Sequence, residues 1–253
     1  MKIVIPSYNR PDVLKQKTLK FLLEENYAPE DIYIFLKNDE QHVLYQQHID
    51  EAVHFVVCNT NNLREKRQFI CDYFPEGELI LSVDDDIKRL KMIKHTSLRD
   101  FVPYMFRKMS EYNCKIWGVY PVNNLFFCKD RLRVGKQLVL FGFYGFVNTK
   151  DFRFPDVIKE DIWYSCYRSQ KDGQILRYDG ACMDTTLYTK GGLKEYRTLE
   201  LEEKTCEAIC NEFPSLVYYT VKKDGHPFCK WYKQNLTEYP FELHSTQSRA
   251  HEE

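Results

Sequence analysis

Short hydrophobic blocks alternate with amphipathic stretches through the first third of the chain. Four blocks have the length and apolar composition of buried strands, and they lie at residues 2–5, 32–36, 53–57 and 79–83. The stretches between them have helical spacing, as where Val13, Leu14, Phe21 and Leu22 share one face behind Asp12, the expected cap. Because parallel neighbours need a crossover connection, this alternation predicts a parallel sheet.

The second half of the chain is less regular. Helices and strands are expected at residues 97–111, 115–120, 175–178, 201–211 and 215–221. Ser97 and Asp100 form a capping box at the start of the first of these helices. The run 138–147 is aromatic and β-branched, but it contains Gly142 and Gly145, which predict either the close approach of a ligand or a bend in the strand.

The elements together predict an α/β fold with a mixed, mainly parallel sheet flanked by helices. At 253 residues the chain suits one large domain, and its 43% hydrophobic and 15% aromatic content is that of a globular protein. We expect two halves within it, at residues 1–125 and 126–243. Residues 244–253 are polar and are expected to form a flexible tail.

Composition limits the compartment and the partners. No apolar run reaches the roughly 18 residues needed to cross a bilayer, and the first ten residues are too soon interrupted by Pro6 for a signal peptide, so a cytoplasmic protein with no membrane contact is expected. Nine cysteines without a CxxC pair fit free thiols. Cys206 and Cys210 lack a further zinc ligand nearby in the sequence and are interpreted as packing residues.

A net charge of −1 gives no overall case for a nucleic-acid partner, but basic residues cluster locally. The clusters are Lys129, Arg131, Arg133 and Lys136, and Lys222, Lys223, Lys230 and Lys233 around Trp231 and Tyr232. Each is either a solvated surface or part of a groove for a polyanion. No oligomeric state is indicated.

An acidic triplet, Asp84, Asp85 and Asp86, follows the expected strand 79–83 directly. Ligand sites in open α/β sheets gather at the carboxyl ends of strands. Adjacent carboxylates repel one another unless a cation neutralises them, so the triplet favours a Mg²⁺ or Mn²⁺ site that meets a diphosphate. The alternative is an acidic turn that caps the next helix. His226, in a Gly-Pro-flanked loop, is either a further metal ligand or an inactive surface histidine.

The other strand ends carry groups suited to a nucleotide. Tyr8 and Arg10 follow the first strand, and Asp39 follows the second. Arg64 and Arg67 begin the helix after the third strand, where cations oppose the helix dipole unless an anion is bound or neighbouring acids pair with them. The chain contains neither GxGxxG nor GxxxxGK[ST], which disfavours dehydrogenases and P-loop kinases.

A second acidic site is expected where a helix begins at Glu160 and Asp161. Carboxylates at a helix start either interact with the dipole or act as a general base.

The ordered set IVIPSYNR, Asp39, NLREKR, SVDDDI and the KED of Lys159 to Asp161 resembles nucleotide-sugar glycosyltransferases of the GT-A fold, which is Rossmann-like. More narrowly, VIPSYNRPDVLKQKTLKFL, YIFLKNDEQ and REKRQFICDYF resemble the TET-associated glycosyltransferases, the group that includes the base J glucosyltransferase and phage enzymes. This resemblance implies UDP-glucose as donor, Mn²⁺ or Mg²⁺ as metal, and 5-hydroxymethylcytosine or 5-hydroxymethyluracil in DNA as acceptor. It also fits a viral or phage source, with the enzyme in the host cytoplasm.

The resemblance also implies roles for the two halves and for single residues. Residues 1–125 would bind the donor, and residues 126–243 would bind the acceptor and carry the catalytic base. Asp84 and Asp86 would flank the metal and the sugar, while the role of Asp85 stays open between metal and donor. The nucleotide and diphosphate would contact Pro6, Tyr8, Arg10, Asp39, Arg64 and Arg67. Asp161, or Glu160 beside it, would be the base of an inverting transfer. An extruded DNA base would stack on an aromatic side chain, for which the candidates are Phe143, Tyr144 and Trp231.

Three other functions fit parts of the pattern. A transferase acting on a glycan, lipid or protein hydroxyl would lack salt-dependent DNA binding. A nucleotidyltransferase would share the acidic strand end but would act on nucleoside triphosphates. A binding module without catalysis is disfavoured, because both acidic sites, the triplet and the Glu160–Asp161 pair, are intact.

Overall fold

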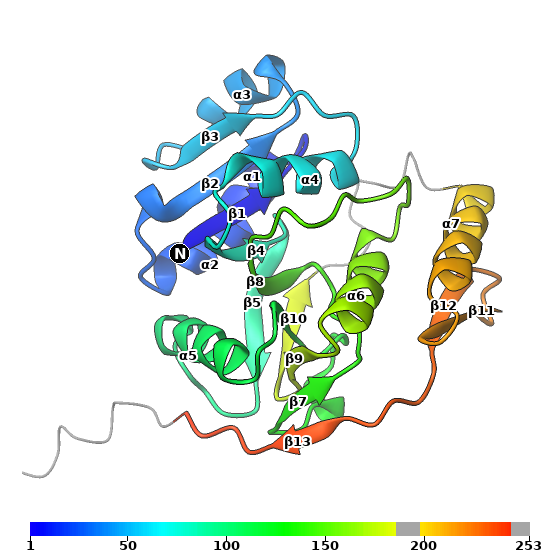
Figure 1. Ribbon diagram of the computed structural model, residues 1–253. Helices are drawn as coiled ribbons and strands as arrows, with labels where there is room; N and C mark the ends of the chain where they lie inside the picture. The colour runs from blue at the N-terminus through cyan, green and yellow to red at the C-terminus, as the bar shows by residue number, and fades with distance from the viewer. Residues whose placement is uncertain (186–197, 244–253) are drawn as a thin grey trace, which may run out of the picture.

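The computed structural model describes residues 1–185 and 198–243. Within them, nine strands form one sheet in the order β13-β7-β9-β6-β8-β4-β1-β2-β3. The pairings show that β8 and β7 run opposite to the other seven strands. Helices lie on both faces of the sheet (Figure 1). The expected mixed, mainly parallel α/β sheet is confirmed.

The first half contains the expected repeating unit of strand and helix. Its strands are β1 (Lys2–Pro6), β2 (Ile32–Leu36), β3 (His54–Val57) and β4 (Leu79–Val83), and all are parallel. Its helices are α1 (Pro11–Leu14), the π-helical turn η1 (Lys15–Leu19), α2 (Lys20–Glu24), the 3₁₀ turn η2 (Pro29–Asp31), α3 (Asp39–Gln46) and α4 (Leu63–Tyr73). Arg10, and not Asp12, is the N-cap of α1. Parallel strands bring their carboxyl ends to one edge, where the predicted donor residues lie.

The elements from residue 87 onward extend the sheet on one side only, beyond β4. They are β5 (Ile87–Met92), α5 (Leu98–Glu111), β6 (Ile116–Val119), the 3₁₀ turn η3 (Leu125–Phe127), β7 (Leu132–Gly135), β8 (Phe143–Val147), α6 (Glu160–Lys171), β9 (Ile175–Tyr178), β10 (Ala181–Thr185), α7 (Leu199–Glu212), β11 (Val217–Val221), β12 (Pro227–Trp231) and β13 (Thr237–Tyr239). β5 pairs with β10, and β11 with β12, as two separate antiparallel ribbons. The capping box at Ser97 is confirmed, since its hydroxyl accepts from the backbone N–H of Asp100.

β8 joins the two halves into one sheet. It lies between β4 and β6 and is antiparallel to both, with Gly145 opposite Leu81 and Trp117. A Cβ on Gly145 would overlap the Trp117 indole, so packing, and not a ligand, explains this glycine. A Cβ on Gly142 would meet the sulfur of Met183 and lie 3.8 Å from Oδ2 of Asp84. The chain therefore passes close to the acidic triplet just before β8 begins.

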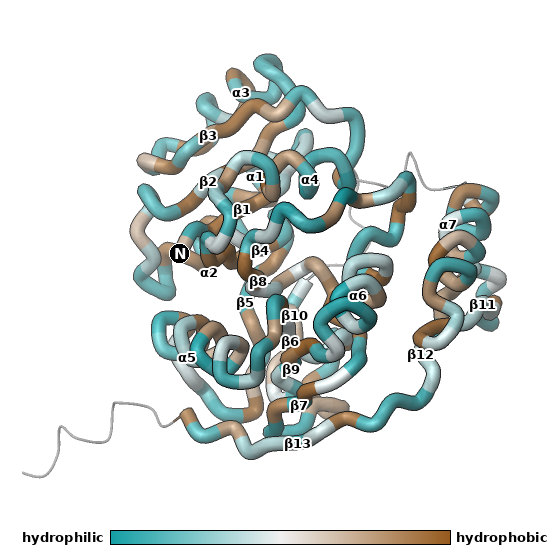
Figure 2. The backbone as a smooth tube through the Cα atoms, in the orientation of Figure 1, coloured by the Kyte–Doolittle hydropathy of each residue, from teal (hydrophilic) through white to brown (hydrophobic). Residues whose placement is uncertain are grey.

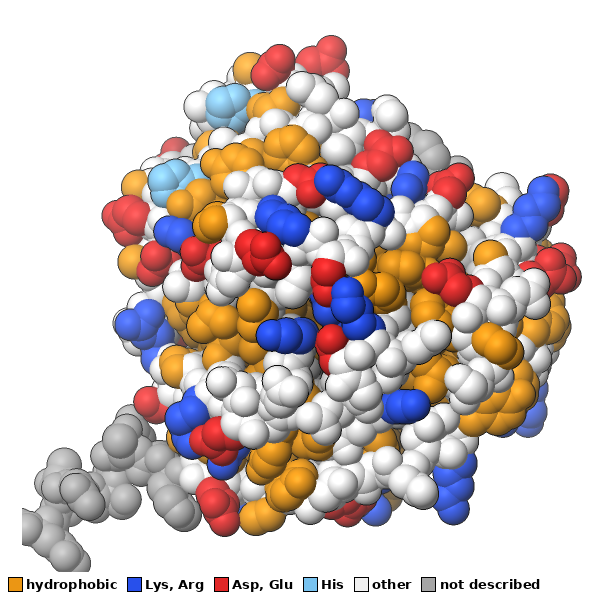
Figure 3. Space-filling model, viewed as in Figure 1, with side chains coloured by type: hydrophobic (Ala, Val, Ile, Leu, Met, Phe, Trp, Pro, Cys, Tyr) orange, Lys and Arg blue, Asp and Glu red, His pale blue; other side chains and the backbone are white. Residues whose placement is uncertain are grey.

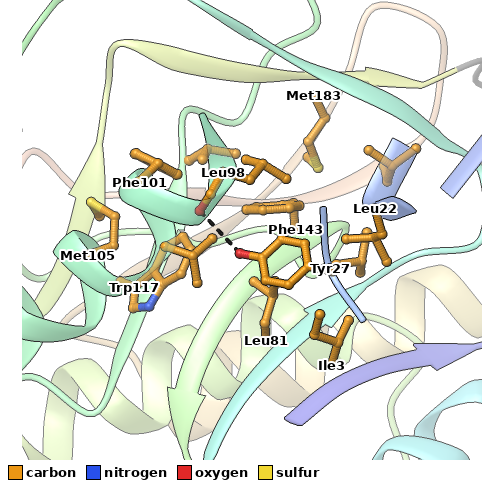
Figure 4. Close-up of a cluster of buried hydrophobic side chains, with 14 of the residues drawn as sticks. Ile3, Leu22, Tyr27, Leu81, Leu98, Phe101, Met105, Trp117, Phe143 and Met183 are labelled. Atoms are coloured by element: carbon orange, nitrogen blue, oxygen red, sulfur yellow. Dashed lines mark hydrogen bonds between the residues drawn. The ribbon is translucent and has the colours of Figure 1, made fainter. Parts of the chain in front are cut away.

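Two hydrophobic clusters pack on the sheet, one on each face. The cluster under α5 includes Phe101, Trp117 and Phe143, and within it the Tyr27 hydroxyl donates to the Leu98 carbonyl at 3.1 Å (Figure 4). The other cluster lies between the sheet and α4, α6 and α7 and includes Tyr144. Successive residues of β8 therefore point to opposite faces. Hydrophobic residues concentrate along the central strands (Figure 2). Among the described helices, none is long and apolar enough to cross a membrane.

Candidate active site

The acidic triplet forms a tight turn at the end of β4. The Asp84 N–H donates to the Gly142 carbonyl at 2.9 Å, which ties the turn to the chain entering β8. On the other side, the buried Thr18 hydroxyl donates to the Asp84 carbonyl at 2.6 Å and accepts from the Ile87 N–H at 2.9 Å. Thr18 lies in the π-helical turn η1, a distortion that is frequent at functional sites. These contacts fix the backbone on which the carboxylates stand.

Asp85 points into the protein. Its side chain is 1% exposed, accepts from the Ser7 hydroxyl at 2.6 Å and pairs with the Arg10 guanidinium. Burial raises the pKa of Asp85 to about 6, although Arg10 and Ser7 act to lower it. Both Asp85 oxygens accept from residues of the loop that follows β1, and binding of the donor by Asp85 stays a prediction. Its role is to anchor that loop to β4.

Asp84 and Asp86 point outward, with 36% and 19% of their side-chain surfaces exposed. The inward turn of Asp85 thus selects one register, with the first and third carboxylates facing the site. Among the described residues, no three acidic, cysteine or histidine side chains gather into a metal site. Two carboxylates suit a Mg²⁺ or Mn²⁺ ion that takes its other ligands from water and phosphate oxygens. The site therefore fits the predicted metal.

The loop after β1 presents two of its three predicted nucleotide residues. Tyr8 is exposed, with the Lys37 ammonium 5.6 Å from its ring centre. Arg10 is half-buried, and its Nε is buried without a hydrogen-bond partner within residues 1–185 and 198–243. Pro6 is buried at the end of β1, so its side chain is not available to line a nucleotide as predicted.

Asp39 is exposed in the first turn of α3, close to this loop. The link is a hydrogen bond of 2.7 Å from the N–H of Asn9, a residue with φ of 55°, to the Gln41 side chain. Asn is one of the few residue types that adopt this left-handed conformation readily. Tyr8 and Asp39 are therefore held on the same side of the site by a specific turn.

The two arginines of α4 have different environments. Arg64 is half-buried and pairs with Asp156 at 3.1 Å and more loosely with Glu65 at 3.5 Å. Arg67 is 4% exposed and lies between two carboxylates, with Nη2 3.0 Å from Asp84 Oδ1 and Nε 3.1 Å from Glu160 Oε1. Arg67 is thus paired with both acidic sites, and direct binding of the donor by Arg67 stays a prediction.

The carboxylates at the start of α6 differ in the same way. Glu160 is buried against Arg67, whereas Asp161 is partly exposed and its Oδ1 accepts from the Ile162 N–H at 2.8 Å. The segment before them is held by α7, since the Ile158 N–H donates to the Thr205 hydroxyl at 3.4 Å and the Lys159 ammonium pairs with Glu202 at 3.3 Å. Of the two predicted bases, Asp161 is the one that faces outward.

Acidic and basic side chains lie next to one another between β4 and α6 in the middle of the face drawn in Figure 3. The two acidic sites are therefore near each other, joined through the one guanidinium of Arg67.

Two of the predicted acceptor residues are core residues. Phe143 is fully buried, and Tyr144 is stacked on Phe141 with ring centres 4.2 Å apart. Neither ring has a free face for a DNA base, so these two predictions are wrong. Trp231 is partly exposed in β12 and packs against the cluster under α7. Aromatic residues with strand alternation fill the two faces of a sheet, and this is the reason for the error.

His226 lies between β11 and β12, and its Nδ1 is 3.6 Å from Glu202. This hairpin lies beside α7, separated from β4 by α6 (Figure 1). Its contact with Glu202 fits the surface alternative, and binding of the metal by His226 stays a prediction.

Three supporting residues were not predicted. Ser7 and Thr18 fix the acidic turn, and the Lys66 ammonium donates to the Ser7 carbonyl at 2.5 Å. Burial lowers the pKa of Lys66 to about 8. Ser7 and Lys66 belong to the motifs PSYNR and NLREKR and were within reach of sequence reasoning, whereas nothing in the sequence signals that Thr18 lies in a π-helical turn.

The fold can be compared with known structures on this basis. Neither a family model nor a curated protein sequence matches the chain. Among solved structures, glucosyl-3-phosphoglycerate synthase from Mycobacterium tuberculosis, in complex with Mn²⁺ and UDP-glucose, is similar at a TM-score of 0.55 and 9% identity over 94% of this chain and 88% of that one. S. aureus TarS is similar at a TM-score of 0.50 and 13% identity, over 83% of this chain and 66% of TarS. A further mycobacterial protein matches at 0.51 and 11% identity, over 95% and 83%.

The chain has the GT-A fold. The chain thus shares its fold with proteins to which it is only 9% and 13% identical. The predicted GT-A-like architecture is confirmed, and TarS extends beyond the length that this chain spans.

Proposed function

We propose that the protein is a metal-dependent, inverting glycosyltransferase that takes a hexose from a UDP-sugar. The observation that carries this proposal is the acidic turn, in which Asp85 is tied inward and Asp84 and Asp86 face outward at the carboxyl end of β4. A turn that served only to cap a helix would not need two partly exposed carboxylates beside a buried one. In addition, β5 and not a helix follows the triplet.

Each of the polar side chains around the acidic turn has a defined task in this proposal. Asp84 and Asp86 hold Mn²⁺ or Mg²⁺, which when bound supplies Lewis-acid stabilisation of the departing UDP. Tyr8 offers a ring to the uracil, and Asp39 accepts hydrogen bonds from the uracil or the ribose. Arg10 and Arg64, both half-buried, face the diphosphate. Recognition of the donor is thus divided among the ends of β1, β2, β3 and β4.

Asp161 acts as the general base. It takes the proton from the acceptor hydroxyl as that oxygen attacks the anomeric carbon, and attack opposite the leaving group inverts the configuration. Glu160 cannot share this task while it is buried against Arg67, so it serves to hold the start of α6. The contacts of Thr205 and Glu202 with the preceding segment support the same turn.

UDP-glucose is the proposed donor. The synthase from M. tuberculosis, which has the same fold, was solved with Mn²⁺ and UDP-glucose, and the outward pair of carboxylates here suits the same combination of ion and diphosphate. The resemblance of the motifs PSYNR and NLREKR to TET-associated glycosyltransferases supports the same sugar.

The proposed acceptor is the hydroxyl of 5-hydroxymethylcytosine or 5-hydroxymethyluracil in DNA. It rests on that resemblance and on the exposed lysines of the β11–β12 region, which are Lys222, Lys223, Lys230 and Lys233. The other basic cluster contributes less, because Arg131 and Arg133 pair with Asp179 and Glu238. Trp231 is the one partly exposed ring among the three predicted stacking residues.

The test is release of UDP from UDP-glucose in the presence of Mn²⁺, with DNA that carries 5-hydroxymethylcytosine, 5-hydroxymethyluracil or neither. We expect release that depends on the hydroxymethyl group, with a hexose found on the base by nucleoside mass spectrometry. Asp86→Asn protein is the matched control and should release no UDP. UDP binding without DNA modification would leave the donor proposal standing and move the acceptor to a glycan, lipid or protein hydroxyl.

A further inference from the structure

The buried Arg67 contacts a carboxylate of each acidic site. Its guanidinium contacts Asp84 at 3.0 Å and Glu160 at 3.1 Å, and its Nη1 lies 3.4 Å from the Tyr144 hydroxyl. The Phe141 ring covers one face, with its centre 4.9 Å from the guanidinium carbon. Packing on several sides thus holds the guanidinium group in one orientation, in which it contacts a carboxylate from each half of the chain.

The position of the guanidinium group matters for metal binding. Arg67 holds Oδ1 of Asp84 from the buried side, and Asp84 is one of the two outward carboxylates. An ion bound to Asp84 would therefore share this carboxylate with a guanidinium. Two cations near one carboxylate repel each other, and this repulsion is weakly screened where water is excluded.

The same guanidinium group matters for the start of α6. Glu160 is buried and receives its charge compensation from Arg67 Nε. A buried carboxylate that loses its cation is destabilised, so the turn that carries Asp161 depends on Arg67. Arg67 thus neutralises a ligand of the metal site and a neighbour of the base at the same time.

We propose that Arg67 is a positioning residue that provides the counter-charge for Asp84 when no metal is bound and holds Glu160, and through it Asp161, in place for transfer. Arg67 thus lowers the affinity of Asp84 for the metal while it keeps the proposed base in position. This inference rests on the proposed function, because it assumes that Asp84 and Asp86 bind Mn²⁺.

The proposal predicts opposite effects on metal binding and on transfer. In Arg67→Gln protein the competing charge is gone, so the Kd for Mn²⁺ without donor should fall by about threefold or more. Arg67→Gln also removes the ion pair with the buried Glu160, so kcat for transfer should fall by roughly 10-fold or more, as when other supporting residues of metal sites are removed. A purely structural role would weaken both together.

Two further variants separate charge from geometry. Arg67→Lys keeps the positive charge but cannot span both carboxylates, so we expect a Mn²⁺ Kd close to that of the unaltered protein with a reduced kcat. Arg153→Gln removes an exposed arginine that pairs with Asp72 and should leave the Mn²⁺ Kd unchanged. This control excludes a general effect of net charge.

The experiment is titration of each protein with Mn²⁺, with free Mn²⁺ measured by electron paramagnetic resonance and folding checked by circular dichroism. Tighter binding by Arg67→Gln alone supports the inference. Equal or weaker binding by folded Arg67→Gln protein, beside normal binding by the unaltered protein, overturns the inference and leaves the proposed function intact. If neither protein binds Mn²⁺, the metal site itself is contradicted, and the inference falls with it.

Discussion

The acidic turn after β4 and the first turn of α6, which carries Glu160 and Asp161, are held in place by different means. The acidic turn is fixed from four directions by Ser7, Arg10, Thr18 and the Gly142 carbonyl, all within the first 142 residues. The first turn of α6 contacts Arg67, and the segment just before it contacts α7. The proposed metal-binding edge is thus held by η1 and by the segments that adjoin β1 and β8, whereas the proposed base is held through contacts with α4 and α7.

Loss of a metal ligand should have the largest effect on activity. Asp86→Asn keeps the shape of the side chain but removes one of the two outward charges, so metal-dependent UDP release should fall by more than the roughly 10–100-fold that loss of an outer-shell partner costs. Stability should change little, because Asp86 has only a loose contact of 3.9 Å with Arg10. Steady-state UDP release and thermal unfolding measure the two effects, and full activity in this variant would remove Asp86 from the site.

Loss of the base should spare the donor. In Asp161→Asn protein we expect transfer to fall by about 10²–10⁴-fold, the usual contribution of a general base, with the UDP Kd unchanged. Calorimetric titration with UDP and Mn²⁺, next to a transfer assay, separates the two sites. Retained transfer would assign the base to another group.

Loss of the buried carboxylate should act on stability first. Asp85→Ala leaves Arg10 without its buried partner, and removing one member of such a pair costs about 3–5 kcal/mol. Urea unfolding of this variant beside Asp86→Asn compares an inward and an outward member of the same turn. Equal destabilisation in the two variants would contradict the assignment of Asp85 as an anchor.

Loosening the support of α6 should have a smaller effect. Thr205→Val removes the hydrogen bond to the Ile158 N–H and should cost about 1 kcal/mol of stability. Ile158 lies two residues before Glu160, where α6 begins, so loosening it should disturb the proposed base and not the donor site. We therefore expect kcat to fall while the KM for the donor stays constant. A raised donor KM would show that α7 supports the donor site as well.

The far end of α6 provides the smallest effect, which is pH-dependent. Hydrogen bonds from Lys171, Thr149 and Arg168 outweigh burial and lower the pKa of Asp151 below its usual range. A carboxylate with a lowered pKa in the folded protein stabilises it at neutral pH, and this contribution is lost as the pH falls. Asp151→Asn should therefore cost about 1 kcal/mol at pH 7, and the difference should shrink below about pH 4. A constant difference in urea unfolding across this range would contradict the ion-pair explanation.

The sequence pattern predicts where both regions lie along the chain, but not the contacts that orient their side chains. The strand ends that carry Tyr8, Asp39 and Asp84 follow from alternation of strands and helices, because parallel strands deliver consecutive segments to one edge. The orientation of Asp85 could not be predicted, since it depends on Ser7 and Arg10 across the sheet. The burial of Phe143 in the core could not be predicted either, because an aromatic run has the same sequence whether its rings face a ligand or the core.

The central claim is that Asp84 and Asp86 together bind a metal that recruits the UDP moiety of the donor. The most direct test is calorimetric titration of the protein with UDP, first with Mn²⁺ and then with the ion removed by chelation. We predict binding that requires Mn²⁺ and that is lost in Asp86→Asn protein although the variant remains folded. UDP binding of equal strength without the ion, or in the variant, would contradict the claim.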